Sequence, residues 1–189
     1  GKYTQNIVNF PLAKDGYRID VEKTMDLAQT VEPKVMILGK SLFLFPEPVR
    51  ELANFCKQHR ISLLYDGAHV LGLIAGREFQ DPLEEGALLI TASTHKTFFG
   101  SQRGLILANA GEIEWRKIDK GAFPGSSSNH HLDTLVALGI ATYEMMEFGQ
   151  AYARQTIANA KVLGAKLFEM GFKVQAAELG FTESHQLAI

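Results

Sequence analysis

Four short, uninterrupted apolar runs, separated by segments with helical spacing, constrain the fold of this chain most. They lie at residues 34–39, 61–66, 87–92 and 104–109. An apolar run of this length suits a strand that is buried on both faces, and alternation with helices is typical of a parallel sheet. We therefore expect an α/β fold with a mainly parallel sheet and helices on both faces.

The segments between and after these runs carry the signals of helix starts and stops. Helices are expected over residues 21–29, 46–58, 67–75, 131–147 and 149–170. Asp20 is placed to cap the first helix and Gly171 to end the last. An expected strand at 172–176 follows. We therefore expect the main domain over 1–148, and a connecting helix with the start of a smaller α/β domain over 149–189.

Composition narrows the possible partners. The formal net charge is −2 and no basic block is present, so nucleic acid is not an expected partner. No apolar run approaches the roughly 20 residues of a membrane span. The single cysteine, Cys56, excludes an intrachain disulfide and suits a small buried side chain in a reducing, cytoplasmic protein. No metal site is expected, since the adjacent pair His130 and His131 would face different ways on a helix.

Polar groups follow three of the expected strands. Ser41 comes after the first, Asp66 after the second, and the run Ser93–Lys96 after the third. The carboxyl ends of parallel strands meet at one edge of a sheet, which is where ligands bind in such folds. A lysine that forms a Schiff base and an aspartate that pairs with a pyridinium nitrogen are the parts needed by a pyridoxal phosphate enzyme. His69, three residues after Asp66, could contact the same cofactor.

Each of these residues also has an ordinary structural interpretation. Asp66 could cap the helix that follows it, and His69 could be a hydrogen-bonded histidine within that helix. Lys96 could be a surface lysine. No Gly-x-Ser-x-Gly elbow, His-Glu-x-x-His pair or P-loop lysine offers a competing chemistry.

Three segments together resemble serine hydroxymethyltransferase. They are Tyr65–Gly76, Ser93–Thr97 and Arg103–Leu107, and the loop Phe123–His131 shares the Phe-Pro-Gly start of a further family segment. The resemblance spans about residues 35–189. The combination of Asp-x-x-His with Thr-His-Lys is the most specific part of it.

The resemblance implies a partial large domain of a fold type I pyridoxal phosphate enzyme. It implies Lys96 and His69 as catalytic residues, with Lys96 as the Schiff-base lysine. The implied cofactor-binding residues are Lys96, Asp66 at the pyridine nitrogen, His69 and Ser41 near the phenolic oxygen, and Thr94 and His95 near cofactor and substrate. The implied reaction moves the hydroxymethyl carbon of serine to a tetrahydrofolate-type carrier and leaves glycine. The implied assembly is a homodimer.

The chain also departs from the family pattern. Gly100–Gly104 reads Gly-Ser-Gln-Arg-Gly where Gly-Pro-Arg-Gly-Gly is common, and Thr182–His185 reads Thr-Glu-Ser-His in place of Thr-Asp-Asn-His. Family segments that precede and follow this stretch are absent, so we expect a piece of a longer enzyme that is inactive alone. A β-hydroxy amino acid aldolase on the same scaffold and a non-catalytic fragment remain alternatives.

Overall fold

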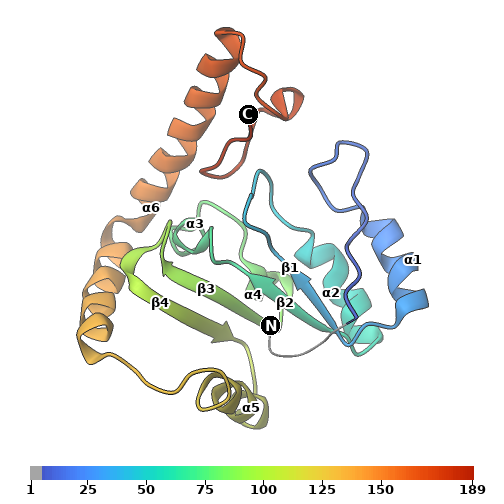
Figure 1. Ribbon diagram of the computed structural model, residues 1–189, viewed down its shortest axis with the longest axis vertical. Coiled ribbons are helices and arrows are strands. Elements are labelled where there is room, and N and C mark those ends of the chain that lie inside the picture. Colours follow the sequence, from blue (N-terminus) through green and yellow to red (C-terminus); the bar gives the residue numbers. More distant parts are fainter. Residues whose placement is uncertain (1–5) are drawn as a thin grey trace.

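The structure, a computed structural model, describes residues 6–189 and is built around a four-stranded sheet (Figure 1). The strands are β1 (Val35–Leu38), β2 (Ser62–Asp66), β3 (Leu89–His95) and β4 (Phe99–Ala108), in that spatial order. The first three are parallel, and β4 runs antiparallel to β3. The expected α/β class with a mainly parallel sheet is therefore confirmed.

Helices connect and flank the strands. They are α1 (Val21–Val31), α2 (Val49–Gln58), α3 (Leu71–Ala75), α4 (Pro82–Glu85), α5 (Glu112–Ala122), α6 (Leu132–Glu169) and the 3₁₀ helix η1 (Ala177–Leu179). Asp20 caps α1 as expected, because its carboxylate accepts a hydrogen bond from the Lys23 amide at 3.1 Å. The sequence did not predict α4 or α5. The first is a single turn, and the second buries no side chain.

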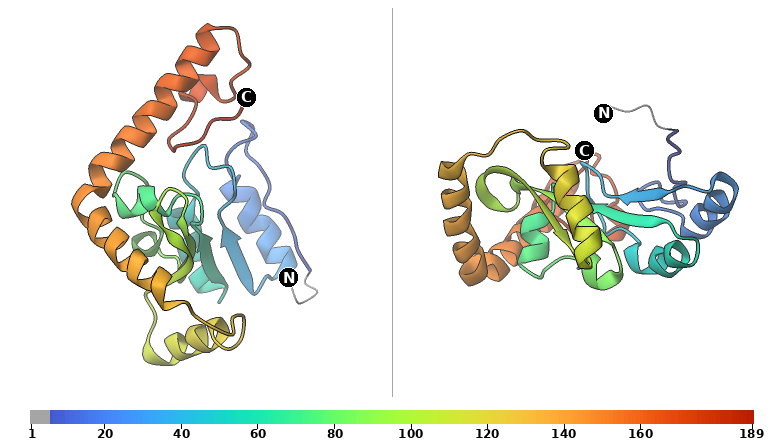
Figure 2. Two further views of the ribbon diagram at one scale, coloured as in Figure 1. Left: turned by 60° about the vertical axis from the view of Figure 1, so that its left-hand side comes forward. Right: turned by 90° about the horizontal axis from the view of Figure 1, so that it is seen from below.

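The two faces of the sheet differ in burial. Alternate side chains such as Met36 and Leu38 are buried, whereas Val35 and Ile37 on the other face are 45% and 57% exposed. Helices α2, α3 and α4 contact β2 and β3, while α6 crosses β4 at one end of the sheet (Figure 2). Helices were expected on both faces of the sheet. Within residues 6–189, they cover only one face completely.

The buried face of the sheet forms the main hydrophobic core. Leu38, Tyr65 and Ile90 project from neighbouring strands and are at most 1% exposed. The Tyr65 hydroxyl donates to Gln80 Oε1 at 2.9 Å, so its polar end is satisfied inside the core. Cys56 is also buried, as expected, and burial raises the pKa of its thiol to about 11.

One continuous helix, α6, replaces the two helices expected over 131–147 and 149–170. Gly149, the first residue of the second expected helix, lies inside α6 and beside the end of α3. A Cβ on Gly76, at the end of α3, would lie 2.5 Å from the Gly149 carbonyl oxygen. Glycine at position 76 therefore lets the end of α3 approach α6 closely, and Gly149 does not interrupt the helix.

The strand expected at 172–176 is not formed. This segment is irregular and leads into η1, and the Gln175 amide donates to the Ala188 carbonyl at 2.8 Å. An isolated stretch of this kind has no ladder partner to hold it as a strand. The division into domains at 148 and 149 stays a prediction.

A close contact joins α3 to the loop between β3 and β4. Gly72 lies so near the Thr97 backbone that a Cβ would overlap the Thr97 carbonyl group. The Gly72 amide also donates to Thr97 Oγ1 at 3.1 Å, and Thr97 is only 6% exposed. Only glycine fits here, because the obstructing atoms belong to backbone and cannot turn aside.

Replacing Gly72 with alanine should therefore make the protein easier to unfold. We expect Gly72→Ala to lower the free energy of unfolding by about 3 kcal/mol or more, since the added methyl group must push two backbone segments apart. Chemical denaturation measures this change. Gly139→Ala is the matched control: Gly139 is exposed on α6 with open space around it, so the substitution should raise stability by about 0.5–1 kcal/mol. Equal free energies of unfolding for the two variants would contradict the close contact between Gly72 and the Thr97 backbone.

Candidate functional site

Lys96 and His69 meet at the end of the sheet. Lys96 lies in the short loop between β3 and β4, and His69 lies in the turn between β2 and α3. Lys96 Nζ is 3.1 Å from His69 Nε2, within hydrogen-bonding distance. Lys96 is exposed and His69 is half-buried, so the lysine amine is open to solvent beside a partly covered imidazole.

Thr97 brings these two residues together. Its hydroxyl donates to the His69 carbonyl at 2.8 Å while accepting the bond from the Gly72 amide. One buried side chain therefore ties the lysine loop both to the turn that carries His69 and to the first turn of α3. The sequence placed Thr97 only among several hydroxyl residues around Lys96. Its position directly after the lysine gave no indication of this contact.

The electrostatics favour a neutral imidazole. Burial lowers the pKa of His69, and the positive charge of Lys96 lowers it further, against a weaker opposing effect of Asp66. A neutral His69 can accept a hydrogen bond at Nε2 from the Lys96 ammonium group, with its remaining proton on Nδ1.

Asp66 stands at the end of β2 with an exposed carboxylate. Its Oδ1 accepts a hydrogen bond from the Ala68 amide at 3.0 Å, which fixes the turn that follows the strand. It does not cap α3, whose N-cap residue is Val70. The helix-capping interpretation is therefore wrong, and the carboxylate remains available at the same sheet edge as Lys96.

Ser41 reaches this edge from the loop after β1. Gly39 has a φ of +116°, and a Cβ there would overlap the Asp66 backbone. Glycine thus lets the end of β1 run close beside the end of β2. The Ser41 side chain is exposed.

Thr94 and His95 face opposite ways. Thr94 is fully buried on the core face of β3, and its hydroxyl lies 2.7 Å from the Ser101 carbonyl and 3.0 Å from the Arg103 carbonyl. His95 is exposed on the alternate face. The structure therefore gives Thr94 a role in shaping the β3–β4 hairpin.

The C-terminal segment adds a histidine that the sequence did not assign to the site. Burial lowers the pKa of His185, and a proton on nearby His69 would lower it further. His185 Nδ1 is buried and has no hydrogen-bond partner among residues 6–189. The Thr182–His185 stretch was the available signal, but it gave no indication that the chain returns to His69.

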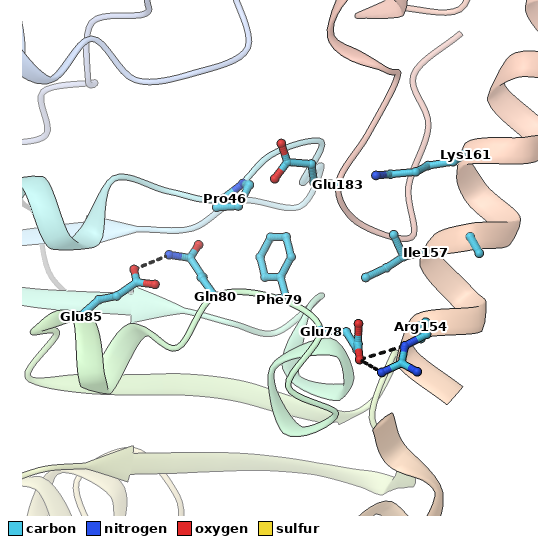
Figure 3. A pocket seen from close by; sticks show the side chains of 10 residues that line it. Pro46, Glu78, Phe79, Gln80, Glu85, Arg154, Ile157, Lys161 and Glu183 are labelled. Atoms are coloured by element: carbon cyan, nitrogen blue, oxygen red, sulfur yellow. Dashed lines mark hydrogen bonds and ion pairs between the residues drawn. The ribbon is translucent and has the colours of Figure 1, made fainter. Parts of the chain in front are cut away.

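A cavity of about 700 Å³ lies elsewhere, between the second half of α6 and the loops after β1 and α3 (Figure 3). Glu78 and Arg154 form a 2.7 Å ion pair along it, and Lys161 points toward Glu183. None of the expected site residues lines it. We base the candidate site on the Lys96–His69 contact because the reactive groups gather there.

Residues 6–189 lack two further features. No helix is both long enough and apolar enough to cross a membrane. No group of three or more histidine, cysteine or acidic side chains in this part of the chain is arranged to hold a metal ion.

Known proteins share both the sequence and the fold. A Methanosphaera stadtmanae serine hydroxymethyltransferase is 52% identical over 97% of this chain and 43% of its own length. A Thermoplasma acidophilum serine hydroxymethyltransferase is 46% identical over 100% of this chain and 44% of its own length. The chain thus spans under half the length of these relatives.

A solved structure agrees with this relationship. The crystal structure of L-threonine transaldolase from Pseudomonas fluorescens, in its internal aldimine state, matches with a TM-score of 0.88 and 32% identity. The match covers 94% of this chain and 41% of that one. This neighbour is a fold type I pyridoxal phosphate enzyme, as expected for the fold. The sequence profile of serine hydroxymethyltransferase matches residues 2–189. The chain belongs to the serine hydroxymethyltransferase family.

Proposed function

We propose that the protein containing this chain is a pyridoxal phosphate-dependent hydroxymethyltransferase that moves a one-carbon unit between serine and a tetrahydrofolate-type carrier. The observation that carries the proposal is the 3.1 Å contact between Lys96 and His69 at the strand ends. Asp66 and Ser41 reach the same edge of the sheet, and the family relationship supplies the reaction class.

The side chains at this edge fit the proposed cofactor. Lys96 offers an exposed amine for covalent attachment, and Asp66 offers an exposed carboxylate for a ring N–H. Ser41 adds an exposed hydroxyl, and His69 adds an imidazole whose lowered pKa favours the neutral form. When bound, pyridoxal phosphate withdraws electrons from the bonds around the substrate α-carbon.

The residues would act in distinct ways. Lys96 would anchor the cofactor, and Asp66 would keep its ring nitrogen protonated by accepting a charge-assisted hydrogen bond. His69 would hold or accept a proton at Nε2, while His95 would approach cofactor and substrate from the end of β3. Thr94 was expected to lie near the cofactor, and we propose that it contributes by holding the hairpin in shape.

The enzyme alternative is cleavage of β-hydroxy amino acids without a folate-type carrier. The structural likeness to an L-threonine transaldolase favours keeping it as the second candidate. None of the contacts described at the site favours a non-catalytic role. The expected cytoplasmic location and the absence of nucleic-acid partners stay predictions.

We further propose that a second copy of the chain packs against the first half of α6. Leu132, Val136, Ile140, Tyr143 and Met146 form one stripe along this helix and are 60–78% exposed. Such a continuous apolar stripe is typical of a buried interface. A homodimer would cover it.

Charge on this stripe should separate the two copies. In sedimentation equilibrium of the intact protein, Met146→Glu should shift a dimer to monomer, because the interface would then bury an unpaired carboxylate. Val162→Glu, on an equally exposed site in the second half of α6, should leave the dimer intact. A monomeric unmodified protein would contradict the proposal.

The carrier requirement distinguishes the two enzyme functions. With serine labelled at its hydroxymethyl carbon, we expect the intact protein to form glycine and labelled carrier only when tetrahydrofolate is present. Lys96→Ala should abolish the reaction because the cofactor anchor is gone, while Lys161→Ala should retain it. Carrier-independent cleavage of threonine at a higher rate than serine transfer would favour the aldolase alternative and contradict the proposed one.

A further inference from the structure

The side chain of Gln186 holds the loop that carries Ser41. Its Oε1 accepts a hydrogen bond from the Phe43 amide at 2.7 Å, and its Nε2 donates to the Ser41 carbonyl at 2.9 Å. One amide group therefore binds the backbone of this loop on both sides of residue 42. Gln186 is more than 140 positions away from Ser41 and Phe43 in the sequence, so this pair of hydrogen bonds is a product of the tertiary fold.

Neighbouring residues fasten the same two segments together. Thr182 Oγ1 donates to the Leu44 carbonyl at 3.1 Å, and the Glu183 amide donates to the same carbonyl at 2.7 Å. The Ser184 hydroxyl donates to the Phe43 carbonyl. Thr182 and Ser184 are at most 1% exposed, so these bonds form away from water and Gln186 approaches the loop from a fixed backbone.

The two ends of this loop, at Lys40 and Glu47, are held together independently of Gln186. Lys40 Nζ lies 2.7 Å from Glu47 Oε1, and Glu47 is only 5% exposed. Gln80 donates to the Glu47 carbonyl at 3.0 Å and accepts from its amide at 2.8 Å. The base of the loop is thus fixed without Gln186. What Gln186 adds is the position of Ser41 itself.

We propose that Gln186 is a positioning residue that sets the Ser41 hydroxyl for contact with the cofactor. This inference rests on the proposed function, since it takes Ser41 as a residue that contacts pyridoxal phosphate. An amide is suited to the task because it donates and accepts at once, whereas a carboxylate can only accept. The role therefore needs an amide side chain and not a carboxylate.

Gln186→Glu isolates the bond to Ser41. The glutamate keeps the length of the side chain and the acceptor for the Phe43 amide, but it turns the donor to the Ser41 carbonyl into a repelling oxygen. We expect pyridoxal phosphate to bind the intact protein about 3- to 10-fold more weakly, as the loss of one hydrogen bond would give. We also expect the absorbance of the bound cofactor to titrate at a changed pH, because Ser41 would lie beside a titrating oxygen.

Two controls separate positioning from general stability. Gln175→Ala removes a bond of 2.8 Å to the Tyr17 hydroxyl in the same C-terminal segment, and it should leave cofactor affinity and titration unchanged. The second control repeats Gln186→Glu in a Ser41→Ala background. If Gln186 acts through Ser41, the double variant should match Ser41→Ala alone, which is the non-additivity of coupled residues.

The outcomes distinguish the positioning role of Gln186 from the proposed function. Wild-type affinity and titration in Gln186→Glu, or fully additive effects in the double variant, would overturn the positioning role and leave the proposed function standing. An unmodified protein that binds no pyridoxal phosphate would overturn the proposed function and the positioning role together. Weakened binding in Gln186→Glu that disappears in the Ser41→Ala background would support the proposal.

Discussion

The contact between Thr97 and the turn after β2 is the interaction on which the site depends. Lys96 and His69 lie on separate loops, and nothing in their own backbones requires them to meet. Thr97 joins the loops through the His69 carbonyl and the Gly72 amide, and glycine at position 72 allows the approach. The reactive pair is thus held by contacts to the backbone beneath it, and its two side-chain nitrogens, Lys96 Nζ and His69 Nε2, meet each other.

A second layer of contacts extends this arrangement across the sheet edge. Gly39 lets the end of β1 come close to the end of β2, and Gln186 returns from the C-terminal segment to hold the backbone beside Ser41. His185 comes with it and adds a half-buried imidazole near His69. Four parts of the chain therefore converge on one edge, as expected for ligand sites in open α/β sheets.

Much of this could be predicted from the sequence because strand ends are local features. The apolar runs gave the three parallel strands, and the residues after them gave Ser41, Asp66 and Lys96 as neighbours. The rest depended on non-local contacts. Two helices were expected over 131–147 and 149–170, yet they form the single helix α6, which packs closely on α3 at Gly76. The direction of Thr94 depended on strand register, and the Gln186 hydrogen bonds join the C-terminal segment to the loop after β1.

The central claim is that Lys96 is the residue that holds the cofactor, and covalent trapping tests it most directly. The intact protein would be incubated with pyridoxal phosphate, reduced with borohydride, digested and mapped by mass spectrometry. We expect a pyridoxyl group on Lys96, with Lys40 at the neighbouring strand end unmodified. A label on Lys40 in place of Lys96, or no label on any lysine, would contradict it.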